Sequence, residues 1–123
     1  MKFHHIGMAV KNIEEYYEDH LKLFGFKEIT ATQVLDAQNV RVAYAINADG
    51  VKIELIEALV EDSPSINVLK RKHGGLYHLG FTPKDFMQDI ELLKNKRFRV
   101  VSLKEDVAFL LAPTKELYEI IEE

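Results

Sequence analysis

Two histidines and two glutamates in this sequence have the types and the spacing to bind one divalent cation. They are His5, Glu54, His78 and Glu119; the histidine positions differ by 73 and the glutamate positions by 65. Imidazole suits zinc, nickel, cobalt and iron, and carboxylate also suits manganese. Around a six-coordinate ion, four such ligands leave two positions for water or for two substrate oxygens. Any one of these residues alone would more often be an ordinary core or surface residue, so their repetition is what favours a shared site.

The sequence around these residues repeats too. His5-Ile6-Gly7 corresponds to His78-Leu79-Gly80. Residues 42–57 correspond without a gap to residues 107–122. Two matches in the same order along the chain indicate a duplicated module.

Each module is expected to fold as a strand, a helix and three further strands. Asn12 is typical of a helix N-cap, with Glu15 as its capping-box partner, and Gly25 is a stop signal. Asp85 and Gln88 have the capping roles in the second module. Apolar patterns predict strands at residues 5–10, 27–32, 40–46 and 51–56, and again at 78–82, 99–103, 107–111 and 117–121. These elements predict an α+β fold of two tandem βαβββ modules, whose mixed sheet curls, partly open, around a metal site.

Alternation along the strands indicates which side chains share a face. In the first strand the apolar Met8 and Val10 can pack on the helix, which leaves His5 and Gly7 on the opposite face. The same alternation puts three further ionisable residues on that face, namely His78, Glu54 and Glu119. The histidines must be neutral to bind a metal, so the metal affinity should fall on acidification.

Other ionisable residues are not expected in this site. His4 has the opposite parity to His5 in the first strand. Glu57 and Glu122 repeat between the modules, but they lie at strand ends with the opposite parity, so we expect them in solvent.

Length and composition suit one domain. The chain has 123 residues, 47% of them hydrophobic, which is enough for a packed core. We expect a single domain over residues 1–123, with module one at about 1–60, a connector at about 61–75 and module two at about 76–123. The connector is expected to hold a short helix that begins at Ser63 and Pro64.

Charge and cysteine content exclude several kinds of partner. The formal net charge is −4, and the densest basic stretch, residues 69–73, is too short for a nucleic-acid track. The absence of cysteine excludes disulfides and thiolate ligands. The sequence shows neither a signal peptide nor an apolar run of membrane-spanning length. We therefore expect a soluble cytoplasmic protein that binds no nucleic acid and no membrane.

Several stretches of the sequence resemble one known family. They are His4–Val10, Ile53–Glu57, Asp62–Pro64, Gly74–Phe81 and Val107–Leu110. On these stretches the chain resembles the vicinal oxygen chelate (glyoxalase/bleomycin resistance/dioxygenase) superfamily, in which paired βαβββ modules curl around a metal. Within that superfamily it looks most like the methylmalonyl-CoA epimerases. Carried over position by position, the metal ligands of the family fall on His5, Glu54, His78 and Glu119.

The resemblance implies a reaction and its participants. The expected enzyme is an isomerase that removes a proton α to a carbonyl of a small-molecule substrate, an acyl-CoA or a thiol adduct, through a metal-stabilised enolate. The cofactor would be a divalent ion of Co, Ni, Zn, Mn or Fe, and the base would be Glu119 or Glu54. Members of the superfamily are often homodimers, so we expect a homodimer here.

Other activities stay open at this point. A lactoylglutathione lyase (glyoxalase I) uses the same two-His, two-Glu set, and the residues do not separate it from an epimerase. A non-catalytic small-molecule or antibiotic-binding relative commonly lacks the ligands. An extradiol dioxygenase needs two histidines and one carboxylate, which a fourth ligand at Glu54 disfavours. The chain also departs from the epimerases in two loops, residues 102–106 and 112–115, which are short and contain no glycine.

Overall fold

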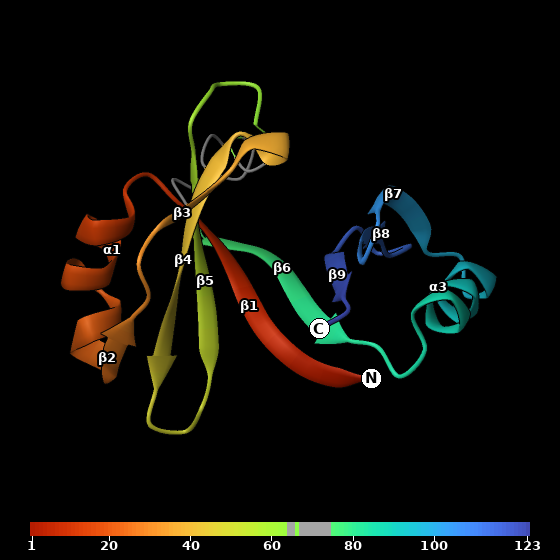
Figure 1. The fold of residues 1–123 in the computed structure, drawn as a ribbon, viewed down its shortest axis with the longest axis horizontal. Coiled ribbons are helices and arrows are strands. Elements are labelled where there is room, and N and C mark those ends of the chain that lie inside the picture. The colour runs from red at the N-terminus through yellow and green to blue at the C-terminus, as the bar shows by residue number, and fades with distance from the viewer. Residues whose placement is uncertain (64–65, 67–74) are drawn as a thin grey trace. The chain divides into compact units, whose positions relative to one another are not determined.

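The computed structural model describes residues 1–63, 66 and 75–123, and it contains strands and helices in both halves of the chain (Figure 1). The chain divides into two units. The N-terminal unit is Ile6–Tyr77, and the C-terminal unit is Met1–His5 together with His78–Glu123. Strand β1 (Lys2–Val10) contributes residues to both units.

The N-terminal unit has a mixed sheet with one helix packed against it. Its further elements are α1 (Ile13–Asp19), the 3-10 helix η1 (Leu21–Phe24), β2 (Phe26–Ile29), β3 (Gln33–Leu35), the 3-10 helix η2 (Asp36–Gln38), β4 (Val40–Asn47) and β5 (Lys52–Ala58). The strand order is β2-β4-β5-β1, with β3 also paired to β4. Strands β1 and β5 are parallel, and β4 is antiparallel to each of its neighbours.

The C-terminal unit repeats this order. Its elements are β6 (Gly75–Thr82) from His78 onward, α3 (Phe86–Asn95), β7 (Arg99–Lys104), β8 (Val107–Leu111) and β9 (Leu117–Ile121). The strand order is β6-β9-β8-β7, with β6 parallel to β9 and the other pairs antiparallel. In each unit the first strand of a module is therefore parallel to the last one. The α+β class that the sequence predicts is confirmed, and each mixed sheet is open.

Helices α1 and α3 begin where the capping signals predict. The side chain of Asn12 accepts a hydrogen bond from the backbone N–H of Glu15 at 2.9 Å. The side chain of Asp85 accepts one from the N–H of Gln88 at 3.1 Å. These oxygens satisfy N–H groups that have no partner within the helix. The first helix is shorter than predicted, because it gives way to η1 before the left-handed Gly25 ends the segment at φ 90°.

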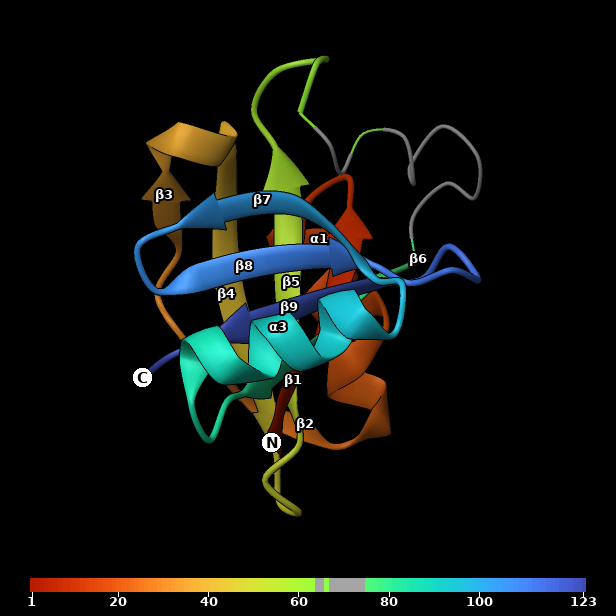
Figure 2. The same ribbon diagram turned by 90° about the vertical axis from the view of Figure 1, so that its right-hand side faces the viewer.

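Each helix covers an apolar face of its own sheet. In the N-terminal unit Ile13 and Tyr17 of α1 pack with Val10 and Leu55, and Met8 is packed against them. In the C-terminal unit α3 lies along β8 and β9 (Figure 2), where four buried residues form the core, namely Ile90, Ala108, Leu110 and Ile120. Full burial of one such aliphatic side chain contributes about 1.5–3 kcal/mol. The alternation predicted for these strands is confirmed, so the residues between the core positions face away from the helices.

The connector is described only in part. Ser63 is buried, and its hydroxyl donates a hydrogen bond to the backbone carbonyl of Asn39 at 2.7 Å. The predicted start of a helix at Pro64 lies outside the described residues, as does the basic stretch at 69–73.

The short β3 and η2 were not predicted. Among the described residues, no helix has both the length and the apolar character needed to span a membrane.

Candidate metal centre

Strand register places His78 and Glu119 on one face of the C-terminal unit. His78 lies on β6 and Glu119 on β9, and the two strands are parallel with Gly80 opposite Glu119. Because Gly80 is two residues after His78, the histidine and the glutamate point to the same side of the sheet. The core residues Phe81 and Ile120 point to the other side, against α3. The folding of the core therefore fixes where the imidazole and the carboxylate point.

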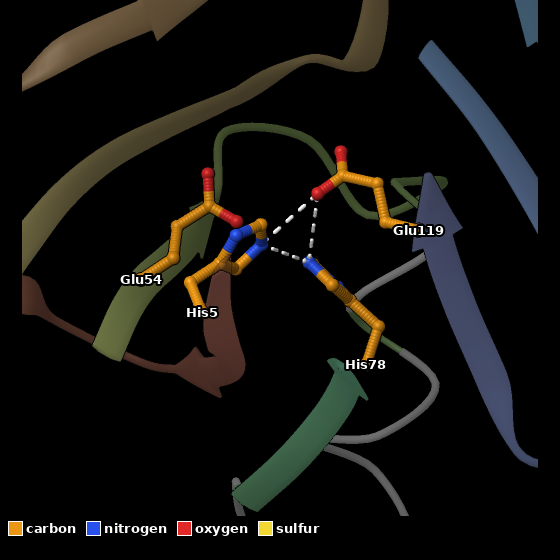
Figure 3. A group of neighbouring side chains, drawn as sticks. All are labelled: His5, Glu54, His78 and Glu119. Atoms are coloured by element: carbon orange, nitrogen blue, oxygen red, sulfur yellow. Dashed lines mark hydrogen bonds and ion pairs between the residues drawn. The ribbon is translucent and has the colours of Figure 1, made fainter. Parts of the chain in front are cut away.

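Three atoms that could bind a metal ion meet in this unit (Figure 3). The Nε2 atom of His5 lies 2.9 Å from Nε2 of His78. It also lies 2.9 Å from Oε1 of Glu119, and this oxygen lies 3.5 Å from Nε2 of His78. All three residues are buried, with 0%, 3% and 7% of their surface exposed. The structure therefore brings His5, His78 and Glu119 together, away from bulk solvent.

These separations suit ligands of a common metal ion. Two atoms that both bind one ion at about 2.1 Å lie about 3.0 Å apart at a right angle and about 3.4 Å apart at a tetrahedral angle. The three separations in the structure fall close to this range. Two imidazole nitrogens and one carboxylate oxygen are also a donor set that divalent zinc, cobalt, nickel and iron accept. The buried His/Glu cluster could thus hold a divalent metal ion.

Neighbouring residues restrict the two imidazole rings. The rings of Phe109 and His78 meet in a T-shaped contact, with centroids 5.3 Å apart and planes at 88°. Gly80 leaves room for the ring of His5: a Cβ added at position 80 would lie 2.7 Å from Nε2 of His5 and 2.5 Å from Nδ1. Real Cβ atoms essentially never approach so closely. Gly80 therefore keeps this face of the sheet open beside His5.

Glu54 lies in the N-terminal unit, where its surroundings repeat those of Glu119. It is buried on β5, and the parallel pairing of β5 with β1 puts it opposite Gly7. Gly7 follows His5 by two residues, just as Gly80 follows His78. On the other side of β5, the antiparallel β4 places Tyr44 opposite Glu54. Each glutamate is thus held beside the glycine that follows a histidine of its own module.

Strand parity did not predict that His4 lies beside the cluster. The Nδ1 atom of His4 lies 2.6 Å from Nδ1 of His5, and Nε2 of His4 pairs with Oε1 of Glu123. Alternation describes the direction of the Cα–Cβ bond, whereas the ring nitrogens lie farther out and depend on side-chain rotation. The sequence signal was only that His4 is adjacent to His5.

The expectation that Glu57 lies in solvent is wrong. Its Oε1 accepts hydrogen bonds from the N–H of Ile13 at 2.9 Å and from Nη2 of Arg41 at 2.8 Å. Arg41 also binds Glu14 with both terminal nitrogens. The hydrogen bonds from Arg41 hold the pKa of the Glu14 carboxyl below its usual range. The signal was the start of α1, where free N–H groups favour a carboxylate.

Comparison with known proteins establishes the family. The family model of the Glyoxalase/Bleomycin resistance protein/Dioxygenase superfamily matches residues 4–110. The chain belongs to this superfamily, and its α+β fold is the glyoxalase-like fold. The resemblance that the sequence suggests is therefore confirmed at this level.

Individual relatives include methylmalonyl-CoA epimerases. The chain is 28% identical to the mitochondrial methylmalonyl-CoA epimerase of Bos taurus over 82% of its own length and 57% of the bovine protein. It is 33% identical to the uncharacterized protein YqjC of Bacillus subtilis (strain 168) over 79% of its length and 68% of YqjC. Among solved structures, it matches a variant of Streptomyces coelicolor methylmalonyl-CoA epimerase in complex with 2-nitronate-propionyl-CoA. That match has a TM-score of 0.82 and 26% identity, and covers 100% of this chain and 97% of the other.

Proposed function

We propose that this chain is a divalent-metal-dependent isomerase that removes a proton α to a carbonyl, with the activity of a methylmalonyl-CoA epimerase. The observation that carries the proposal is the convergence of His5, His78 and Glu119 on a buried point. The epimerases among the related proteins support an enzyme of this kind. They favour it over the glyoxalase I and binding-protein alternatives.

Four residues would hold the metal in this proposal. His5, His78 and Glu119 supply three ligands, and we propose Glu54 as the fourth. The support for Glu54 is the repeated register, because Glu54 faces Gly7 as Glu119 faces Gly80. Two carboxylates would balance the charge of a dication, which lowers the cost of burying it. When bound, a Co, Ni, Zn, Mn or Fe ion supplies Lewis-acid stabilisation of negative charge on substrate oxygens.

The same glutamates would move the proton. One carboxylate, Glu119 or Glu54, takes the proton from the α-carbon. Return of a proton to the opposite face of that carbon gives the epimer, and return to the same face gives back the substrate. Both residues are buried, with 7% and 8% of their surface exposed. Burial keeps bulk water from competing for the carbanion-like centre and strengthens the electrostatic interactions around it. His5 and His78 orient the site without taking the proton.

The substrate we propose is an acyl-CoA thioester with an acidic α-hydrogen. The support is that the Streptomyces coelicolor enzyme is seen with 2-nitronate-propionyl-CoA, and that the bovine relative is a methylmalonyl-CoA epimerase.

We also propose that the protein acts as a cytoplasmic homodimer. Size-exclusion chromatography with light scattering would contradict the dimer if the protein ran as a monomer at every concentration and metal loading tested.

Hydrogen exchange at the substrate tests the reaction. The metal-loaded protein is incubated in heavy water with (2R)- or (2S)-methylmalonyl-CoA, and separately with the glutathione–methylglyoxal adduct. We expect deuterium at the α-carbon of methylmalonyl-CoA and conversion to the other epimer. Turnover of the glutathione adduct alone would replace the epimerase with a lactoylglutathione lyase. Turnover of neither substrate would contradict both.

Variants of the two glutamates identify the base. Glu119→Gln and Glu54→Gln keep the size of each side chain but remove its capacity to take a proton. We expect one of them to abolish exchange while it retains measurable metal, and the other to act mainly through metal loss. Glu122→Gln, at an exposed neighbouring position, is the matched control and should exchange at the wild-type rate.

A further inference from the structure

A series of contacting side chains connects the proposed ligand His5 to Glu123, the last glutamate of the sequence. The Nδ1 atom of His5 lies 2.6 Å from Nδ1 of His4, and the rings meet edge to face with centroids 4.9 Å apart. On its other side, Nε2 of His4 contacts the carboxylate of Glu123. All three residues belong to the C-terminal unit.

The two nitrogens of His5 face different partners. Its Nε2 faces His78 and Glu119 in the cluster, whereas its Nδ1 faces His4. A neutral imidazole has one N–H and one nitrogen lone pair. To bind a metal through Nε2, His5 must keep its lone pair there and its hydrogen on Nδ1. That N–H then points at His4.

The same logic assigns the hydrogen of His4. If Nδ1–H of His5 donates to Nδ1 of His4, the latter nitrogen must accept with its lone pair. His4 therefore has its own hydrogen on Nε2, where it donates to the carboxylate of Glu123. Each donor in the chain meets an acceptor, and neither ring needs a second hydrogen.

We propose that His4 and Glu123 are positioning residues, whose hydrogen bonds hold the His5 imidazole with its Nε2 lone pair directed at the metal. This inference rests on the proposed function, because it takes His5 as a ligand. Such outer partners fix the tautomer and orientation of a metal-binding histidine, and their loss typically lowers metal affinity about 10–100-fold. The negative charge of Glu123 strengthens the chain by making its hydrogen bond charge-assisted.

Substitutions at position 4 can separate hydrogen bonding from ring packing. His4→Phe keeps an aromatic ring but has no acceptor for Nδ1–H of His5. His4→Asn loses the ring, but its Oδ1 can occupy the place of Nδ1 and accept that hydrogen bond. If His4 acted only by filling space, the phenylalanine variant would be the better replacement. The positioning role predicts the opposite order.

The experiment is a zinc titration of the wild type, both position-4 variants and Glu123→Gln, with circular dichroism to confirm folding. We expect His4→Phe to lose about tenfold or more in zinc affinity. His4→Asn should lie closer to the wild type, and Glu123→Gln should lose less than His4→Phe. Controls are His20→Phe, at an exposed histidine stacked on Tyr16, and Glu122→Gln next to Glu123. Both should bind zinc as the wild type does.

A spectroscopic readout tests the hydrogen bond between His5 and His4 without any reaction. In zinc-loaded protein labelled with 15N, a scalar coupling between the two Nδ1 nuclei would report the N–H···N bond between His5 and His4. We expect that coupling in the wild type and its absence in His4→Phe. A His4 ring with its hydrogen on Nδ1, or zinc affinity equal in His4→Phe and the wild type, would overturn the inference and leave the proposed function standing. A wild type that binds no metal would overturn both.

Discussion

Gly80 lies against the imidazole of His5, so closely that any side chain at position 80 would overlap the ring. An added Cβ would stand 2.7 Å from Nε2 of His5, the atom that faces His78 and Glu119. The glycine is therefore required by the ring beside it. Its backbone would accept other residues, because its φ does not lie in the left-handed region.

The Gly80→Ala variant should lose metal while it stays folded. The new methyl group displaces the His5 ring, which can turn away without disturbing the apolar core on the other face of the sheet. We expect zinc or cobalt affinity to fall about 10–100-fold, as for other changes that misorient a ligand. Gly25→Ala is the matched control: it has no atom within 4 Å of the added Cβ but sits at φ +90°. It should lower stability and leave metal affinity unchanged.

Metal should raise the thermal stability of the protein. A ligand that binds only the folded state stabilises it by about 2.7 kcal/mol when its concentration is 100 times Kd. Differential scanning fluorimetry with added cobalt or zinc should show a rise in Tm that a chelator reverses. The rise should shrink on acidification, because the ligands must be deprotonated to bind. An equal rise in His78→Ala would mean that the metal binds elsewhere.

Arg41 should make stability depend on pH through Glu14. The pKa of Glu14 is lowered from 4.5 by hydrogen bonds from Arg41, so the unfolded state binds the proton more readily. This contribution to stability is present above pH 4.5 and is lost as the pH falls through the lower, folded-state pKa. In Arg41→Gln, urea unfolding should show a weaker dependence on pH below 4.5. The effect should be small, since Glu14 is exposed and screened by solvent. Lys22→Gln, which breaks the exposed pair with Glu18, is the control.

The free energy of unfolding should be sensitive to shortening of the core side chain that follows Glu119. Ile120 has 1% of its surface exposed and packs with the α3 side of the sheet, whereas the adjacent Ile121 is half-buried. Ile120→Ala should lower the free energy of unfolding by about 2–5 kcal/mol, measured by urea denaturation. Ile121→Ala should cost less. Equal losses would contradict the assignment of the two faces of β9.

The sequence predicts the fold through signals that are local. Side chains at Asn12 and Asp85 bond the first helical turns, and alternation at Met8 and Phe81 selects the core face. These signals act within a few residues, so a single sequence contains them. The repeat adds information over a longer distance, because it predicts that His78 and Glu119 share a face before any pairing of strands is known.

Contacts that depend on side-chain rotation could not be predicted from the sequence. Strand alternation places His4 away from His5, yet the rings meet through their Nδ1 atoms. Glu57, near the end of β5, has the parity of the core residue Leu55, and its carboxylate reaches the first N–H of α1 and Arg41. Both residues have long or rotatable side chains, so backbone direction leaves the positions of their polar atoms open. The short β3 has too few residues to show a period.

The most direct test of a shared metal centre is the stoichiometry of metal binding, measured by equilibrium dialysis and elemental analysis. We expect the wild type to bind one divalent ion per chain, and His5→Ala, His78→Ala and Glu119→Ala each to lose it while remaining folded by circular dichroism. A wild type that takes up no divalent ion, or three variants that retain it with unchanged affinity, would contradict the account.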